Sequence, residues 1–187
     1  DVVIVSAIRT PVGAFQGALS SIAAHKLGAI TIKAVLEETN VDPGSVDEVI
    51  MGNVLSAGQG QAPARQAALG AGLPDSVECL TINKMCGSGL KAVMLGTQAI
   101  QTGDAEIVIA GGMENMTQAP YLLPKGRDGH RLGHGQVIDS MIIDGLWDAY
   151  NDKHMGNCAE LCASEKKYSR EAQDEFAKTS YSRAQAA

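Results

Sequence analysis

One cysteine, Cys86, stands where a thiol could act as a nucleophile. It follows the apolar run 77–82, which predicts a strand, and precedes a helical run that begins near Gly87. The unpaired N–H groups and the positive dipole end at a helix start stabilise a thiolate, the reactive form of cysteine. The same groups can hold the negative oxygen that forms when sulfur attacks a thioester carbonyl. Gly87 and Gly89 lack side chains, so a substrate could approach the backbone closely.

Two other interpretations of these residues are open. A cysteine is often only a small residue of the packed core. Alternatively, Gly87, Gly89 and Ala92 match the dinucleotide-binding pattern G-x-G-x-x-A. That pattern places its first glycine directly at the strand end, whereas residues 83–86 intervene here, and it needs an acidic residue at the end of the next strand, where Glu106 instead lies at the beginning. The residues therefore favour covalent chemistry over binding of a nicotinamide or flavin.

The elements that must position this cysteine alternate along the first part of the chain. The predicted strands are 2–7, 48–54, 77–82 and 106–110, and the predicted helices are 24–39, a short one that Pro63 opens and Gly70 or Gly72 closes, and one that follows Cys86 and ends at Gly103. This alternation predicts an α/β fold with a mostly parallel sheet and helices on both faces. Ligands bind at the carboxyl ends of such strands, and Cys86 and Glu114 both follow a strand end. The helix after Cys86 carries few charges, which predicts burial on most of its sides.

After about residue 118 the sequence changes to a long loop rich in glycine and proline. Helical segments are expected near 139–150, 155–167 and 170–187, with Phe176 facing inward in the last.

Composition argues against several classes of protein. The 187 residues carry a net charge of -6 and only 4% aromatic side chains, so nucleic-acid binding is not expected. No apolar run approaches the ~20 residues that cross a bilayer, and no secretory signal is recognised at the start, so we expect no membrane partner. Four scattered cysteines do not make a disulfide framework. We therefore expect a reducing, cytoplasmic location, or an organelle matrix if the organism is a eukaryote.

Five segments along the chain resemble motifs of the thiolase family, in the family's order. The segment 83–93 resembles the nucleophile loop of these enzymes, and the other four are 9–15, 60–66, 111–116 and 154–156. Each short motif alone is weak, but five in order with compatible spacing make a strong resemblance that covers essentially the whole chain.

The resemblance implies the thiolase-like fold, in which two related halves form five layers and a mainly helical loop domain is inserted in the first half. Residues 1–118 resemble the N-terminal α/β domain and would supply four strands of its sheet. Residues 119–187 resemble the first part of the loop domain. The C-terminal half of the family's fold has no counterpart among these residues.

The activity implied is that of a short-chain thiolase of lipid metabolism. Two acetyl-CoA would condense to acetoacetyl-CoA and CoA, reversibly, through an acyl-thioester on Cys86. Coenzyme A thioesters would be substrates, and no cofactor is implied. The base, a second cysteine and an oxyanion-holding asparagine belong to the family's second half, so the isolated chain is predicted to be inactive. A longer-chain 3-ketoacyl-CoA thiolase and a non-catalytic fragment of the fold are the alternatives.

The resemblance also assigns substrate-binding residues. His154 and Met155 would line the pocket near the reacting thioester, with Met155 limiting the acyl group to a small one, and Leu146 would touch the pantetheine arm of CoA. His154, Cys158 and Cys162 share a helix face, but three such residues span ~12 Å, so no metal site is expected. A homo-oligomer, either a dimer or a tetramer, is implied.

Overall fold

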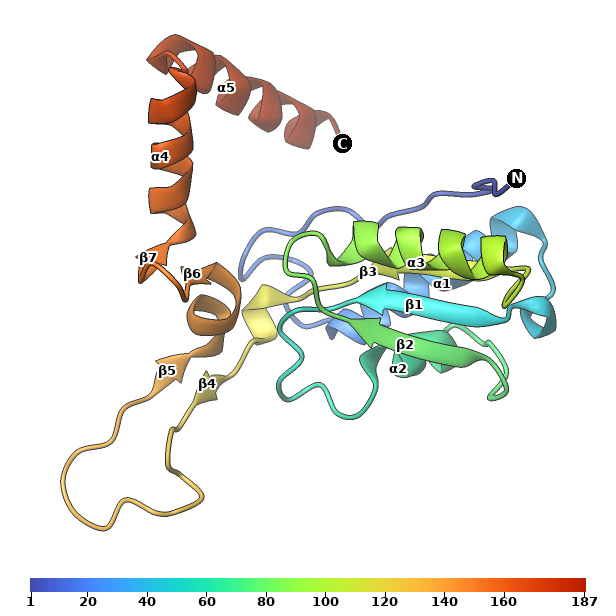
Figure 1. Ribbon diagram of the computed structural model, residues 1–187, viewed down its shortest axis with the longest axis horizontal. Coiled ribbons are helices and arrows are strands. Elements are labelled where there is room, and N and C mark those ends of the chain that lie inside the picture. The colour runs from blue at the N-terminus through green and yellow to red at the C-terminus, as the bar shows by residue number, and fades with distance from the viewer. The chain divides into compact units, whose positions relative to one another are not determined.

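The computed structural model describes residues 1–187, which form two compact units, Asp1–Gly145 and Leu146–Ala187. The first unit contains a parallel sheet flanked by helices, and the second contains a short hairpin and two helices (Figure 1). The domain boundary near residue 118, which concerns the complete fold of the family, stays a prediction.

The sheet of the first unit has three parallel strands in the order β2-β1-β3. Its strands are β1 (Glu48–Gly52), β2 (Glu78–Ile82) and β3 (Val108–Gly112). The central strand is almost entirely buried because helices cover both of its faces. Gly52 lies opposite Ile82 on one side and Gly112 on the other, so all three strands end at the same level. The segments that follow the strands therefore leave one common edge of the sheet.

Three helices cover this sheet, α3 on one face and α1 and α2 on the other (Figure 1). Their bounds are Ala24–Thr39 for α1, Pro63–Gly70 for α2 and Ser88–Thr102 for α3. Local signals set these ends. Pro63 opens α2, and left-handed residues, Asn40 and Gly103, terminate α1 and α3. The predicted α/β fold with helices on both faces is confirmed.

The main hydrophobic core lies between the sheet and the pair α1 and α2. It is built from aliphatic side chains and alanines that are almost fully buried, among them Ile32, Val49, Met51, Ala64 and Ala67. The other face packs differently, because α3 turns mainly small residues to the sheet. A Cβ added to Gly96 would lie 2.9 Å from Cγ1 of Val108. The expected burial of α3 on most sides is wrong for this chain: Leu90 is 70% exposed, since only one sheet face contacts the helix.

Residues 2–7 form no strand, which corrects the sequence-based prediction of four sheet strands to three. Val3, Ile4 and Val5 are each more than 70% exposed. A strand is stabilised by backbone hydrogen bonds to a neighbour, and no other segment of this chain pairs with these residues. The apolar composition of residues 2–7 therefore predicted a strand, but no strand of this chain pairs with it.

Short elements complete the first unit. They are the 3₁₀ turns η1 (Pro43–Ser45) and η2 (Met116–Gln118), the two-stranded antiparallel ladder of β4 (Tyr121–Leu122) and β5 (Ile138–Asp139), and the π-helix η3 (Met141–Leu146), whose last residue opens the second unit. The predicted glycine-rich loop connects β4 to β5. The helix expected over 139–150 is only one turn long.

The second unit starts with a hairpin and continues into two helices. Its elements are β6 (Trp147–Asp148), β7 (Lys153–His154), α4 (Met155–Lys166) and α5 (Arg170–Ala186). Phe176, expected to face inward, is 79% exposed because nothing within this unit packs over that side of α5. No helix of the chain combines the length and the apolar character needed to cross a membrane.

Candidate active site

Cys86 lies in the turn between β2 and α3, which follows the common end of the three strands. Figure 1 shows the path of this connection from β2 to α3. The Cys86 side chain is exposed and makes no disulfide. Gly87 directly precedes the first residue of α3, as the switch from apolar to helical spacing predicted. The interpretation of Cys86 as a packed core residue is therefore wrong, because the turn holds the thiol at the surface.

The turn before α3 is closed by hydrogen bonds on both sides of Met85. The Gly87 amide donates to the Lys84 carbonyl at 3.2 Å, and the Ser88 amide donates to the Met85 carbonyl at 3.0 Å. The Asn83 side chain accepts from the Met85 amide at 2.9 Å. Met85 itself has a φ of 50°, a left-handed conformation that costs a residue with a long side chain free energy. The surrounding bonds hold this conformation.

Three backbone amides in the segment from Cys86 to Leu90 are left without a partner in the chain, those of Cys86, Gly89 and Leu90. The last two belong to the first turn of α3, where no side chain caps the helix. Such amides, with the helix dipole, favour a thiolate and can hold a developing oxyanion. The segment from Cys86 to Leu90 thus carries both a nucleophile and unused hydrogen-bond donors.

Small residues bring the start of α3 directly onto the ends of the strands. A Cβ added to Gly52 would lie 2.6 Å from Cβ of Ser88 and 2.9 Å from the amide nitrogen of Gly89. A Cβ added to Gly89 would lie 3.7 Å from the backbone of Gly111 and Gly112. The glycine at position 52 is therefore what allows the helix start to approach the sheet edge so closely, whereas a Cβ at position 89 would make an ordinary van der Waals contact.

The loop after β1 is fixed by Glu114, which follows β3. One carboxylate oxygen accepts from the Val54 amide at 2.8 Å, and the other accepts from the Leu55 amide at 3.1 Å and from Nδ2 of Asn53 at 2.8 Å. Asn53 is 2% exposed, and its backbone N–H donates to the carbonyl of Ile82 at 3.0 Å. This network joins the ends of all three strands. Glu114 was predicted to lie at this edge, whereas Asn53 and Ser88 were missed; the one signal for Asn53 is a polar residue directly after a buried strand.

The predicted substrate-binding residues lie in the second unit. Leu146 is half-buried and precedes β6, in which Trp147 pairs with His154. His154 is exposed and accepts from the Gly156 amide through Nδ1 at 3.0 Å, which caps α4. Met155 is the first residue of that helix and is 39% exposed. The hairpin brings these three residues to one end of the unit, and their roles toward a substrate stay predictions.

Metal ligation finds no support in the arrangement of side chains. No group of three or more His, Cys, Asp or Glu residues is placed to hold one ion. His154, Cys158 and Cys162 are spread along the start of α4 and its following turns.

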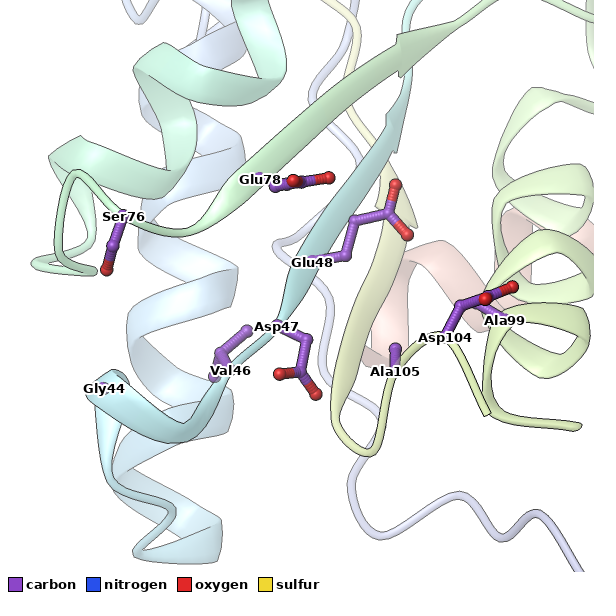
Figure 2. A pocket seen from close by; sticks show the side chains of 9 residues that line it. All are labelled: Gly44, Val46, Asp47, Glu48, Ser76, Glu78, Ala99, Asp104 and Ala105. Carbon is purple, nitrogen blue, oxygen red and sulfur yellow. The ribbon is translucent and has the colours of Figure 1, made fainter. Parts of the chain in front are cut away.

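A hollow of about 420 Å³ lies at the opposite edge of the sheet, where the strands begin. Figure 2 shows four carboxylates around it, those of Asp47, Glu48, Glu78 and Asp104. Burial, and then the charge of Glu78, raise the pKa of Glu48. Backbone N–H donors hold the pKa of Asp47 below its ordinary value. No cysteine, histidine, lysine or arginine lines this hollow, so we place the candidate active site at the Cys86 edge instead.

Comparison with known proteins identifies a family. The family described as "Thiolase, N-terminal domain" matches residues 2–187. The chain is 62% identical over 187 residues to the acetyl-CoA acetyltransferase of Cupriavidus necator, covering 100% of this chain and 48% of that relative. It is 59% identical to the enzyme of that name from Pseudomonas aeruginosa, covering 48% of it, and 56% identical to acetyl-CoA acetyltransferase 2 of Arabidopsis thaliana, covering 46%. The chain spans about half the length of the curated relatives it matches.

Proposed function

The chain belongs to the thiolase family, and on that premise we propose that it supplies the nucleophile of an acetyl-CoA C-acetyltransferase. Sγ of Cys86 attacks the carbonyl of acetyl-CoA, the bond from that carbonyl to the sulfur of CoA breaks, and CoA leaves as the thiol once protonated. The α-carbon of a second acetyl-CoA then loses a proton and attacks the enzyme thioester. The products are acetoacetyl-CoA and the free Cys86 thiol, and the reverse direction is thiolysis.

The observation that carries this proposal is the exposed thiol of Cys86 in the turn that leads directly into a helix whose first amides are unused. A thioester carbonyl gains negative charge on its oxygen when sulfur attacks, and amides that are already fixed stabilise this charge without reorganising. The names of the relatives, which state acetyl transfer from CoA, agree with this chemistry.

The complete reaction needs groups beyond those in this chain. Deprotonating an α-carbon requires a positioned base, and no hydrogen bond joins Cys86 to a histidine here. Because the chain spans about half of its relatives, we propose that the remaining half supplies the base and that the isolated chain does not condense acetyl-CoA.

Other features of the proposed enzyme follow the family. Leu146 contacts the pantetheine arm, His154 and Met155 line the acyl pocket, and no cofactor takes part. The assembly is a homo-oligomer, a dimer or a tetramer, that acts in lipid metabolism. All four cysteines are free, as suits a reducing compartment such as the cytoplasm or an organelle matrix.

The test joins this chain to the half of the Cupriavidus necator relative that it does not match. Incubation with acetyl-CoA, followed by acid quench and peptide mass spectrometry, should place one acetyl group on Cys86. Cys86→Ser should abolish this labelling, whereas Cys162→Ser, a matched change of another exposed cysteine, should leave it intact. A folded fusion that releases acetoacetyl-CoA without a labelled Cys86 would exclude the proposed mechanism. A folded fusion without either product would favour the non-catalytic alternative.

Acyl-chain length separates the two enzymatic candidates. Thiolysis of acetoacetyl-CoA by the fusion is expected to exceed thiolysis of longer 3-ketoacyl-CoA substrates. The opposite order would favour a longer-chain thiolase.

A further inference from the structure

The side chain of Ser88 makes two hydrogen bonds to the turn that presents Cys86. Its Oγ accepts from the Lys84 amide at 2.8 Å and donates to the Met85 carbonyl at 2.5 Å. Ser88 is only 5% exposed and is the first residue of α3. A single hydroxyl thus links the helix to backbone groups on both sides of the turn.

The Lys84 amide depends on this hydroxyl, which is its only hydrogen-bond partner in the chain. The Met85 carbonyl, by contrast, also accepts from the Ser88 amide. Losing the hydroxyl would leave the Lys84 amide unpaired and the left-handed Met85 held by fewer bonds. An unpaired amide and a strained φ both favour rearrangement of the turn.

We infer that Ser88 is a positioning residue for the nucleophile: its hydroxyl holds Met85 in the left-handed conformation, and this fixes the position of Cys86 relative to the start of α3 and its free amides. Ser88 needs no contact with substrate to act in this way. The inference rests on the proposed role of Cys86 as the nucleophile, and its test uses a small electrophile, so that it does not depend on acetyl-CoA.

The sheet edge explains why the position is occupied by serine and not by a larger polar residue. The space between β1 and α3 is so small that a Cβ on Gly52 would lie 2.6 Å from Cβ of Ser88. Serine provides one hydroxyl without a further branch. The same crowding fixes the serine side chain, since it has little room to adopt another rotamer.

The experiment measures the rate of alkylation by iodoacetamide at each cysteine of the 187-residue chain, using peptide mass spectrometry. Cys162, exposed and in the second unit, serves as the internal reference. In Ser88→Ala the ratio of the Cys86 rate to the Cys162 rate should fall about fivefold, the size expected when a charge loses a helix N-terminus. Thr97→Val removes another α3 hydroxyl, one that donates to the Val93 carbonyl at 2.9 Å, and should change the ratio by less than about twofold.

A second substitution distinguishes positioning from general loosening of the fold. Asparagine tolerates the left-handed conformation far better than methionine does. Adding Met85→Asn to Ser88→Ala should therefore restore the ratio to within about twofold of the wild-type value. An unchanged ratio in folded Ser88→Ala, or no recovery in the double variant, would overturn the inference.

Hydrogen exchange of the wild-type chain tests the same role of Ser88 without a variant, and it applies if Ser88→Ala does not fold. The Lys84 amide should be protected, and the amides of Cys86, Gly89 and Leu90 should exchange quickly. Rapid exchange at Lys84 would show that the Ser88 hydroxyl does not hold the turn. If the fusion never acetylates Cys86 but the alkylation ratio still falls in Ser88→Ala, the proposed function fails and the positioning role stands.

Discussion

Gly52, the last residue of the central strand, lies so close to Ser88, the first residue of α3, that no side chain fits between them. A Cβ on Gly52 would lie 2.6 Å from Cβ of Ser88 and 2.8 Å from its carbonyl carbon. Neither atom belongs to the far end of a flexible side chain. Any side chain at position 52 must therefore move the start of α3, and with it the turn that holds Cys86.

Gly52→Ala is expected to destabilise the chain by roughly 1–3 kcal/mol, because overpacking a rigid contact forces a backbone shift. Urea unfolding followed by circular dichroism measures the effect. Gly111→Ala is the matched control at the same edge: its new Cβ would meet only the flexible end of Met51, at 3.4 Å. The control should unfold within about 0.5 kcal/mol of the wild type. Equal midpoints for the two variants would show that α3 yields easily at Gly52.

Glu114→Gln should cost about 1.5–3 kcal/mol, as expected for loss of hydrogen bonds to a charged group. Its carboxylate accepts from the amides of Val54 and Leu55 and from the Asn53 side chain. A glutamine keeps one acceptor oxygen but turns an NH₂ group toward donors. Glu37→Gln is the control, since Glu37 is an exposed helix residue that lies 3.9 Å from Lys33, and it should change stability by less than about 0.5 kcal/mol. Similar unfolding curves for both variants would contradict a structural role for the Glu114 network.

Much of this architecture could be predicted from local sequence signals. Pro63 marked the start of α2, Gly103 marked the end of α3, and the change from apolar to helical spacing located the turn around Cys86. Each of these signals acts over a few residues, so no knowledge of distant contacts was needed. The glycine-rich turn that presents the thiol could likewise be located from neighbouring residues alone.

Features that depend on distant partners could not be predicted in this way. The run 2–7 has the composition of a buried strand but no neighbour within the chain. The partners of Glu114 lie about sixty residues earlier. Which amides around Cys86 remain free depends on the left-handed Met85 and on the Ser88 hydroxyl, and neither follows from hydrophobic periodicity.

The neighbouring carboxylates of Asp47 and Glu48, at the edge where the strands begin, should change the free energy of unfolding in opposite directions as pH rises. The pKa of Glu48 is raised by burial and then by Glu78, so the folded state binds this proton more tightly than the unfolded state does. Its stabilising contribution is complete below the ordinary value of 4.5 and is lost as pH rises through the raised pKa. Glu48→Gln should therefore be more stable than the wild type near neutral pH, and the difference should close in acid.

Asp47 provides the control of opposite sign. Its pKa is lowered by the backbone amides of Ile107 and Glu106, which donate to Oδ2 at 3.0 and 2.7 Å. The resulting stability is present above the ordinary value of 3.8 and is lost as pH falls through the lowered pKa. Asp47→Asn should therefore be less stable than the wild type near neutral pH and approach it in acid. Unfolding free energies of both variants across this pH range test the pair, and shifts of the same sign would contradict the assignment.

Asn115 should control the order of the segment before α1. Its Nδ2 donates to the carbonyls of Leu19, Ser20 and Ile22 at 3.3, 3.2 and 2.7 Å. Asn115→Asp replaces this donor with a carboxylate oxygen that faces three carbonyl oxygens. We expect a loss of about 3 kcal/mol or more, with faster hydrogen exchange at the amides of Ser20 and Ile22. Because protonation removes the charge, the loss should shrink as pH falls.

The matched control for this change is Gln173→Glu in the second unit. The Gln173 side chain donates to a single exposed carbonyl, that of Tyr168, at 3.1 Å. The same replacement of an amide by a carboxylate should cost less than about 1 kcal/mol there, because water can solvate the new charge. If Asn115→Asp left exchange at Ser20 and Ile22 unchanged, the three carbonyl contacts would not be what holds this segment, and Nε2 of Gln118, which donates to the Ser20 carbonyl at 2.8 Å, would be the remaining side-chain contact to test.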